Sequence, residues 1–336
     1  MSGADGRRRV ALVLTGGSLN SLGAGRLDLA WYIEAGRRLE PGEFLARIPE
    51  VAGFAAVEEV TFRRMNSHAL TDRDWLDLLR FVTALLGEDR ADGVVIGHGT
   101  NTIEETAYFL TLTLKSPRPV VLAGGMRPAS GMSTDGELNV TNAIRVAADP
   151  AAAGRGVLVV MNDAIFAGRD VTKGATYRLQ AFQARDAGPL GYADADGQVI
   201  WLHRTEKRHT TESAFDIAGL ESLPRVDVVV SYVGADGAMI DAAVAAGAQG
   251  IVSAGTGAGR PTPLEDEALD RAAAAGVLVC QASRVGSGRV VAAPALRRRG
   301  FVAAGDLQPW KARVLLQLAL TVSRDPAAVQ GLFDTH

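Results

Sequence analysis

The stretch Gly93-Val-Val-Ile-Gly-His-Gly-Thr-Asn-Thr102 is an apolar run that ends in small and hydroxyl-bearing residues. It leads directly into Ile103-Glu-Glu-Thr-Ala-Tyr-Phe-Leu110, so the pattern predicts a buried strand, a tight turn and the start of a helix. In open α/β sheets, ligands bind outside the carboxyl ends of the strands, where the N–H groups of helix N-termini favour an anion. We therefore expect a binding site at this edge of the sheet.

Comparable apolar runs recur through the first 203 residues and alternate with segments of helical periodicity. Besides the opening stretch, strands are expected at 10–14, 56–62, 120–124 and 156–161, and helices at 43–48, 72–86 and 137–148. Strands that alternate with helices at this spacing predict an α/β fold built on a mostly parallel, doubly wound sheet.

The periodic pattern weakens over 204–224, which is polar and typical of a linker. A second series of elements follows the linker. It comprises strands at 226–231, 250–253 and 276–280, alanine-rich helices at 238–246 and 264–275, and a last helix at 309–322. We expect two domains, a larger N-terminal one over 1–203 and a smaller C-terminal α/β domain with a parallel sheet over 225–336.

Composition excludes several classes of protein. The 336 residues carry a net charge of -3 and are 47% apolar, which argues against a nucleic-acid groove or a polybasic membrane surface. Cys280 stands alone in an apolar run, as a small buried hydrophobe would in a reducing compartment. The apolar run 10–14 is too short for a secretory signal. We expect a soluble, cytoplasmic protein without nucleic-acid or membrane partners.

Polar residues follow three of the expected strands: Thr15 and Ser18, Thr100 and Asn101, and Lys173. A hydroxyl nucleophile needs a base, and a lysine whose charge is disfavoured by burial can serve, directly or through a second hydroxyl. Ser18 as nucleophile, with Thr100 relaying its proton to Lys173, is therefore chemically complete. Backbone N–H groups of the glycine turns would hold an oxyanion. The alternative is that these hydroxyls only cap helices.

Two further features allow more than one interpretation. The glycine-rich segment 20–38, which contains Tyr32, is typical either of a mobile lid or of an ordinary loop and helix. His98 follows an apolar strand, and a packed imidazole with one nitrogen bonded is favoured over a catalytic base.

Seven blocks of sequence together resemble the bacterial L-asparaginase/glutaminase family of the asparaginase I/II type, of which the chain is identified as a divergent member. The resemblance covers nearly the whole chain, in order. The blocks are Thr15-Gly-Gly-Ser-Leu19, His98-Gly-Thr-Asn-Thr-Ile-Glu-Glu-Thr-Ala-Tyr-Phe-Leu110, Gly125-Met-Arg-Pro128, Gly156-Val-Leu-Val-Val-Met-Asn-Asp163, Gly168-Arg-Asp-Val-Thr-Lys173, Gly188-Pro-Leu-Gly-Tyr192 and Lys311-Ala-Arg-Val-Leu-Leu-Gln-Leu-Ala-Leu320.

The resemblance implies hydrolysis of a small-molecule carboxamide, L-asparagine to L-aspartate and ammonia, through an acyl-enzyme and without a metal or cofactor. It implies a homotetramer or homodimer whose active sites are completed by the neighbouring chain. It places the nucleophile on Ser18, the second hydroxyl on Thr100, the base on Lys173 and the lid tyrosine on Tyr32. The substrate-binding positions that follow are Thr15, Gly17, Ser67, His68, Gly99, Asn101 and Arg260.

Several positions depart from the family pattern. Ser18 replaces a threonine, and Asn101 replaces an aspartate that binds the substrate's α-ammonium and belongs to the catalytic triad. His68 replaces a glutamine, and no carboxylate lies between Val285 and Ala304, where the family has a glutamate near Ala293.

These departures predict weak binding of the ammonium of free L-asparagine. One alternative is therefore an amidase for a related carboxamide whose α-amino group is absent or blocked. A second is a non-catalytic binding protein on the same fold, against which the intact Ser18, Thr100 and Lys173 argue.

Overall fold

The computed structural model describes residues 6–34, 36–87 and 90–336. Residue contacts divide the chain into two compact units, Met1–Glu212 and Ser213–His336. Each unit has its own sheet and its own apolar core. Within the described ranges, no helix is long and apolar enough to cross a membrane.

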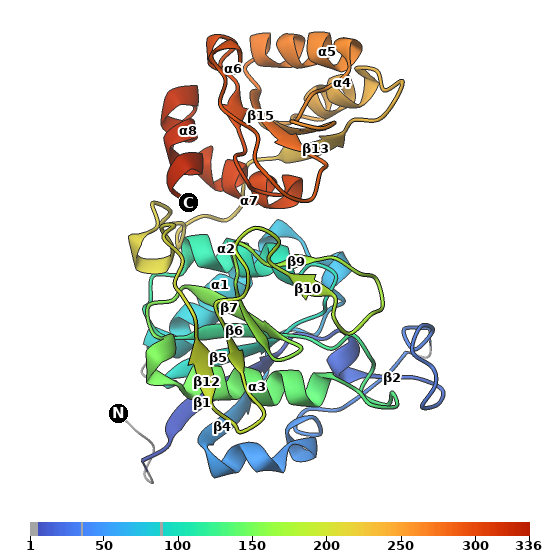
Figure 1. Ribbon diagram of the computed structural model, residues 1–336, viewed down its shortest axis with the longest axis vertical. Coiled ribbons are helices and arrows are strands. Elements are labelled where there is room, and N and C mark those ends of the chain that lie inside the picture. The colour runs from blue at the N-terminus through green and yellow to red at the C-terminus, as the bar shows by residue number, and fades with distance from the viewer. Residues whose placement is uncertain (1–5, 35, 88–89) are drawn as a thin grey trace. The chain divides into compact units, whose positions relative to one another are not determined.

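The first unit is built on an eight-stranded sheet with the strand order β12-β11-β8-β7-β6-β5-β1-β4 (Figure 1). Five neighbouring strands are parallel, which confirms the expected mostly parallel sheet: β1 (Arg8–Leu14), β4 (Ala55–Val60), β5 (Gly93–Gly97), β6 (Val120–Ala123) and β7 (Val157–Met161). Three short strands extend it in antiparallel fashion: β8 (Ala164–Ala167), β11 (Gly191–Ala193) and β12 (Val199–Trp201).

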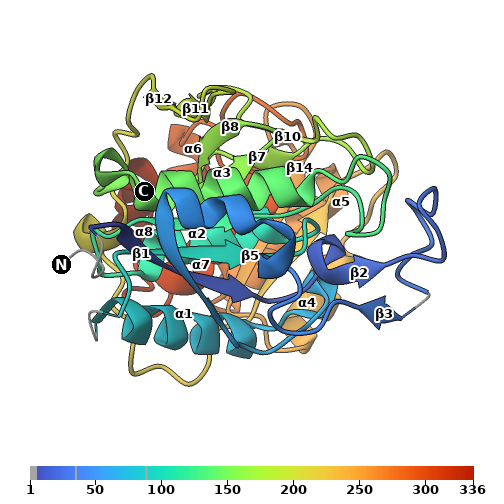
Figure 2. The same cartoon turned by 90° about the horizontal axis from the view of Figure 1, so that it is seen from below.

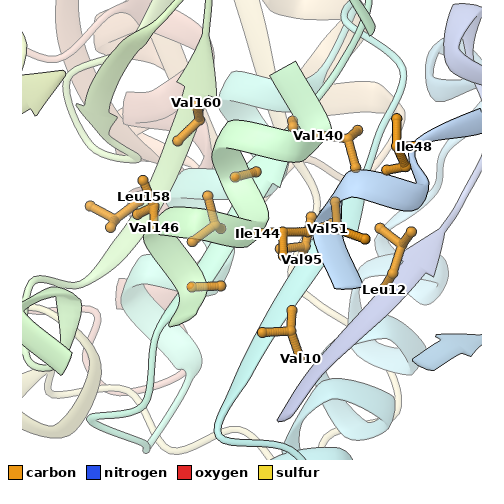
Figure 3. Packing of buried hydrophobic residues seen from close by; sticks show 14 of the residues in the cluster. Val10, Leu12, Ile48, Val51, Val95, Val140, Ile144, Val146, Leu158 and Val160 are labelled. Carbon is orange, nitrogen blue, oxygen red and sulfur yellow. The ribbon is translucent and has the colours of Figure 1, made fainter. Parts of the chain in front are cut away.

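Helices cover both faces of this sheet, with α3 on one face and α1 and α2 on the other (Figure 2). Their bounds are α1 (Asp72–Gly87), α2 (Ile103–Thr113) and α3 (Gly136–Ala148). Alternate residues of the buried strands point to opposite faces. Figure 3 shows Ile144 of α3 beside Val95 of β5, and Val140 and Val10 belong to the same apolar cluster.

Short elements connect these layers. Two hairpins stand apart from the large sheet: β2 (Ser21–Leu22) with β3 (Arg37–Arg38), and β9 (Thr172–Lys173) with β10 (Phe182–Gln183). The described residues include the 3₁₀ helices η1 (Ser18–Asn20), η2 (Leu45–Arg47), η3 (Pro49–Gly53), η4 (Ser67–Ala69), η5 (Pro150–Ala152) and η6 (Thr210–Glu212). The expected helix at 43–48 is therefore wrong, because only η2 and its flanking turns form there. The described part of 20–38 is a hairpin arm, not a loop followed by an α-helix.

The second unit has a four-stranded parallel sheet, as expected, in the order β13-β14-β15-β16. Its strands are β13 (Val226–Val230), β14 (Gly250–Gly255), β15 (Leu278–Ser283) and β16 (Val302–Ala303), and its helices are α4 (Ala238–Ala245), α5 (Pro263–Ala274), α6 (Pro294–Arg298), α7 (Pro309–Ala319) and α8 (Pro326–Thr335). Helix α7 was expected to be the last, which is wrong. Helix α8 follows it and is capped by the side chain of Asp325.

Helix α3 gives a direct test of the first unit's core. Ile144 is fully buried, whereas Leu138 on the same helix is 54% exposed. We expect Ile144→Ala to lower the free energy of unfolding by about 2–5 kcal/mol, because it leaves a cavity. Urea denaturation measures the loss. Leu138→Ala is the matched control and is expected to stay within about 0.5 kcal/mol; equal losses in the two variants would contradict the packing of α3.

Candidate active site

The turn after β1 holds Ser18 at the carboxyl edge of the first unit's sheet. Gly16 and Gly17 have φ values of 127° and 85°, which side chains disfavour. A Cβ on Gly17 would also lie 2.5 Å from the Cα of Gly99, and one on Gly16 would lie 2.4 Å from the carbonyl oxygen of Met65. Both positions therefore require glycine. The turn presses against the turn that follows β5.

The Ser18 side chain is buried at the first position of η1. Its hydroxyl donates a hydrogen bond to the carbonyl oxygen of Gly125, and it shares a second hydrogen bond with the phenol of Tyr32. Burial raises the pKa of Tyr32, so its hydroxyl is protonated at neutral pH.

Lys173 of β9 reaches the turn after β5 through its ammonium nitrogen. Its Nζ lies 2.9 Å from the Thr100 hydroxyl and 3.5 Å from Asn101 Oδ1. Its backbone N–H donates to the buried carboxylate of Glu104 at 3.3 Å. Burial lowers the pKa of Lys173, and the charge of Glu104 opposes that shift. The lysine therefore loses its proton more readily than an exposed one.

The two turns bring most of the expected site residues together. Thr15 donates its hydroxyl to the carbonyl oxygen of Gly97 at 3.1 Å, which ties the end of β1 to the end of β5. The hydroxyl of Ser67, the first residue of η4, lies against Gly99, because a Cβ on that glycine would be 2.5 Å from it. His68 follows Ser67 with an exposed side chain. Ser67 is thus placed beside the Gly99–Thr100 peptide.

Arg260 belongs to the second unit. Its side chain is exposed, and its backbone forms an isolated antiparallel bridge with Thr256. The first unit alone therefore assembles every other expected site residue.

Sequence reasoning did not anticipate the role of Gly125, whose carbonyl oxygen accepts a hydrogen bond from the Ser18 hydroxyl. It also did not anticipate Glu104 beside Lys173. Two signals were available: Gly124-Gly125 follows a strand in the same way as Gly16-Gly17 does, and Glu104 lies in the first turn of a helix that begins at the sheet edge.

The backbone N–H groups of Ser18 and Thr100 are among those at this edge that have no acceptor in the described chain. Such groups are suited to an oxyanion that forms between the two turns. Among the described residues, no cluster of three or more His, Cys, Asp or Glu side chains could hold a metal ion.

Two family models match the chain. One is described as "Asparaginase, N-terminal" and matches residues 9–207. The other is described as "Glutaminase/Asparaginase C-terminal domain" and matches residues 225–333.

Similar proteins span almost the whole chain. "Probable L-asparaginase periplasmic" of Haemophilus influenzae is 40% identical over 97% of this chain and 92% of its own length. "L-asparaginase 2" of Escherichia coli is 42% identical over 86% of this chain and 83% of its own length. "Glutaminase-asparaginase" of Pseudomonas fluorescens is 38% identical over 96% of this chain and 89% of its own length. The crystal structure of "Probable Cytoplasmic L-asparaginase" from Campylobacter jejuni superposes with a TM-score of 0.94 at 36% identity, covering 98% of this chain and all of that one.

The contact between the two turns can be separated from the cost of a positive φ. Gly17 and Gly42 have φ values of 85° and 84°, but only Gly17 has atoms in the way of a Cβ. We expect Gly42→Ala to cost about 1 kcal/mol of folding free energy from φ alone. Gly17→Ala should cost a further ~1–3 kcal/mol from overlap with Gly99. Chemical denaturation measures both, and equal costs would show that the turns do not touch.

Proposed function

The chain belongs to the asparaginase family, and on that premise we propose that it hydrolyses the side-chain amide of L-asparagine to L-aspartate and ammonia, with Ser18 as the nucleophile. It is thereby an amidohydrolase. The observation that carries the proposed mechanism is the hydrogen bond of 2.9 Å between Lys173 Nζ and the Thr100 hydroxyl, one turn away from Ser18. That bond supplies the base that a hydroxyl nucleophile needs.

Acylation begins when the Ser18 hydroxyl turns from the Gly125 carbonyl oxygen towards Thr100. Thr100 takes the Ser18 proton and passes its own to neutral Lys173, while the Ser18 oxygen attacks the amide carbon. The N–H groups of Ser18 and Thr100 hold the resulting oxyanion. Collapse of this intermediate returns a proton to the leaving nitrogen, so ammonia departs and an ester on Ser18 remains.

Deacylation uses the same groups with water in place of the serine. Lys173 and Thr100 take a proton from water, whose oxygen attacks the ester carbon, and the proton then returns to the Ser18 oxygen as L-aspartate leaves. The phenol of Tyr32 lies beside the Ser18 hydroxyl oxygen. The proposal assigns it to holding that oxygen in place.

Substrate contacts are assigned from the resemblance and from position. Ser67 receives the substrate's α-carboxylate, which fits a buried hydroxyl beside the Gly99–Thr100 peptide. Thr15, Gly17 and Gly99 shape the floor of the site. The family resemblance assigns three further substrate contacts, which are His68, Asn101 and Arg260.

The proposed chemistry is tested at Ser18. Ser18→Ala removes the attacking oxygen, so ammonia release from L-asparagine should fall by a factor of about 10³ or more. Ser18→Thr keeps a hydroxyl on the same carbon, Cβ, and is the matched control. Its rate of ammonia release should remain within about tenfold of the wild-type rate. Coupled detection of ammonia measures all three proteins. Retention of activity by Ser18→Ala would refute the nucleophile, and an inactive wild type would favour the non-catalytic binding protein.

A second candidate function is hydrolysis of a carboxamide that lacks a free α-ammonium. Asn101 favours it, because its amide oxygen accepts from Lys173 Nζ at 3.5 Å. The amide nitrogen of Asn101 is then the group left for a ligand, and it donates hydrogen bonds as an ammonium does. Such a group suits a carbonyl or carboxylate oxygen better than an ammonium.

Asn101→Asp tests this candidate. The new carboxylate should raise kcat/KM for L-asparagine relative to succinamate, the same amide without the amino group, by about tenfold or more, since a charge pair contributes upwards of 1.4 kcal/mol. Ammonia release from the two substrates by wild type and variant gives the ratio. A wild type that already prefers L-asparagine strongly, with a ratio that Asn101→Asp leaves unchanged, would contradict it.

The assembly and the compartment belong to the same proposal. We propose a homotetramer or homodimer, supported by the family resemblance and by the exposed apolar residues Tyr232, Val233 and Met239 of the second unit. Light scattering would detect a multiple of 35.2 kDa. Relatives are named for both the periplasm and the cytoplasm. We propose the cytoplasm, which cell fractionation tests.

A further inference from the structure

A chain of buried hydrogen bonds runs behind the turn that carries Thr100, and the proposed mechanism does not use it. His98 is 1% exposed and directly follows β5. Its Nδ1 lies 2.8 Å from the carbonyl oxygen of Gly99, and its Nε2 lies 3.1 Å from the hydroxyl of Thr106 on α2. That hydroxyl also accepts a hydrogen bond of 2.9 Å from the indole N–H of Trp75 on α1. Both imidazole nitrogens are thus engaged, where the sequence led us to expect one.

The direction of every hydrogen bond in this chain is determined. A carbonyl oxygen only accepts, so Nδ1 of His98 carries the proton. Burial lowers the pKa of His98 to about 4, so the ring is neutral and Nε2 is an acceptor. The Thr106 hydroxyl therefore donates to Nε2, while its oxygen accepts from Trp75, whose indole can only donate. A neutral, buried imidazole with both nitrogens engaged in hydrogen bonds cannot serve as a proton-transfer base.

What the chain does fix is the orientation of one peptide. The carbonyl of Gly99 and the N–H of Thr100 belong to the same planar trans peptide and point in opposite directions. Since His98 holds the carbonyl towards the interior, the N–H of Thr100 points away from the imidazole. No described group accepts that N–H. Because Gly99 has no side chain, a peptide at this position turns easily unless something holds it.

We propose that His98 is a positioning residue that aims the N–H of Thr100 at the oxyanion of the tetrahedral intermediate, through its hydrogen bond to the Gly99 carbonyl. This inference rests on the proposed hydrolysis at Ser18. Trp75 and Thr106 act one step further back, since they keep the proton of His98 on Nδ1. The link joins helices α1 and α2 to the reacting atoms without any contact with substrate.

Two replacements of His98 separate its two nitrogens. Asparagine carries an amide N–H at the position of Nδ1 and can still donate to the Gly99 carbonyl. Glutamine carries its amide at the position of Nε2, so it can meet Thr106 but not Gly99. We expect His98→Gln to lower kcat by about 10- to 100-fold, somewhat less than the loss of a whole oxyanion donor, and to leave KM within about threefold. His98→Asn should recover at least about tenfold of that loss in kcat.

Thr106→Val tests the chain without touching the imidazole. It removes the donor to Nε2, so the ring can place its proton on either nitrogen, and we expect kcat to fall about three- to tenfold at unchanged KM. Thr113→Val is the matched control. Thr113 is also a buried threonine on α2, but its hydroxyl donates to the carbonyl oxygen of Phe109 in its own helix. It should leave kcat unchanged.

Steady-state kinetics with L-asparagine and succinamate, together with melting temperatures, distinguish the outcomes. A fall in kcat for His98→Gln, with recovery in His98→Asn, supports the inference. Wild-type kcat in His98→Gln, or equal losses in both folded variants, overturns it. If neither His98 variant folds, Thr106→Val decides, and an unchanged kcat there overturns the inference. A wild type that releases no ammonia from either substrate refutes the proposed function itself, and the inference falls with it.

Discussion

The structure of the site depends on the close approach of two glycine turns. Strands β1 and β5 are parallel neighbours that end in register, with Leu14 opposite Gly97, so the chain leaves both at the same edge of the sheet. Gly17 then lies so near Gly99 that a single Cβ would collide with the facing backbone. The residues that follow these two glycines are Ser18 and Thr100. The absence of side chains at Gly17 and Gly99 therefore lets the two turns approach closely, and Ser18 and Thr100 approach with them.

The side chain that meets Thr100 comes from outside the large sheet. Lys173 belongs to a short hairpin outside the main sheet, and its amine is carried to the Thr100 hydroxyl while its backbone is held by Glu104. Burial makes the charge of an amine costly, which is what a lysine base requires, yet Glu104 limits how far its pKa falls. The carboxylate therefore holds the backbone of Lys173 in position and keeps a larger fraction of its amine protonated.

The sequence predicted those parts of the fold in which one local signal was sufficient. The buried parallel strands have continuous apolar runs, and the helices between them have a clear period. Strand β8 was missed because it resumes the apolar run of β7 after only two polar residues, Asn162 and Asp163. Both of these residues have positive φ and form the turn that reverses the chain, so that β8 pairs with β7 in antiparallel fashion. Helix α8 did have a signal, Asp325 followed by proline, which marks a helix start.

The groups of the candidate site also divide into those that the sequence predicted and those that it did not. Side chains with reactive groups, such as Ser18 and Lys173, could be named from chemistry and from the family pattern, and their roles stay predictions. The backbone acceptor could not be singled out, because every residue has a carbonyl. The Gly124-Gly125 pair marks a turn at the end of a strand, but not which carbonyl oxygen accepts the hydrogen bond of Ser18. Asn101 shows why one residue can change two properties at once. A carboxylate there would attract a substrate ammonium and would also raise the pKa of Lys173, whereas the amide gives up the ammonium and leaves the lysine easier to deprotonate. Substrate preference and base strength are therefore coupled at this position, and neither can be altered by charge alone without altering the other.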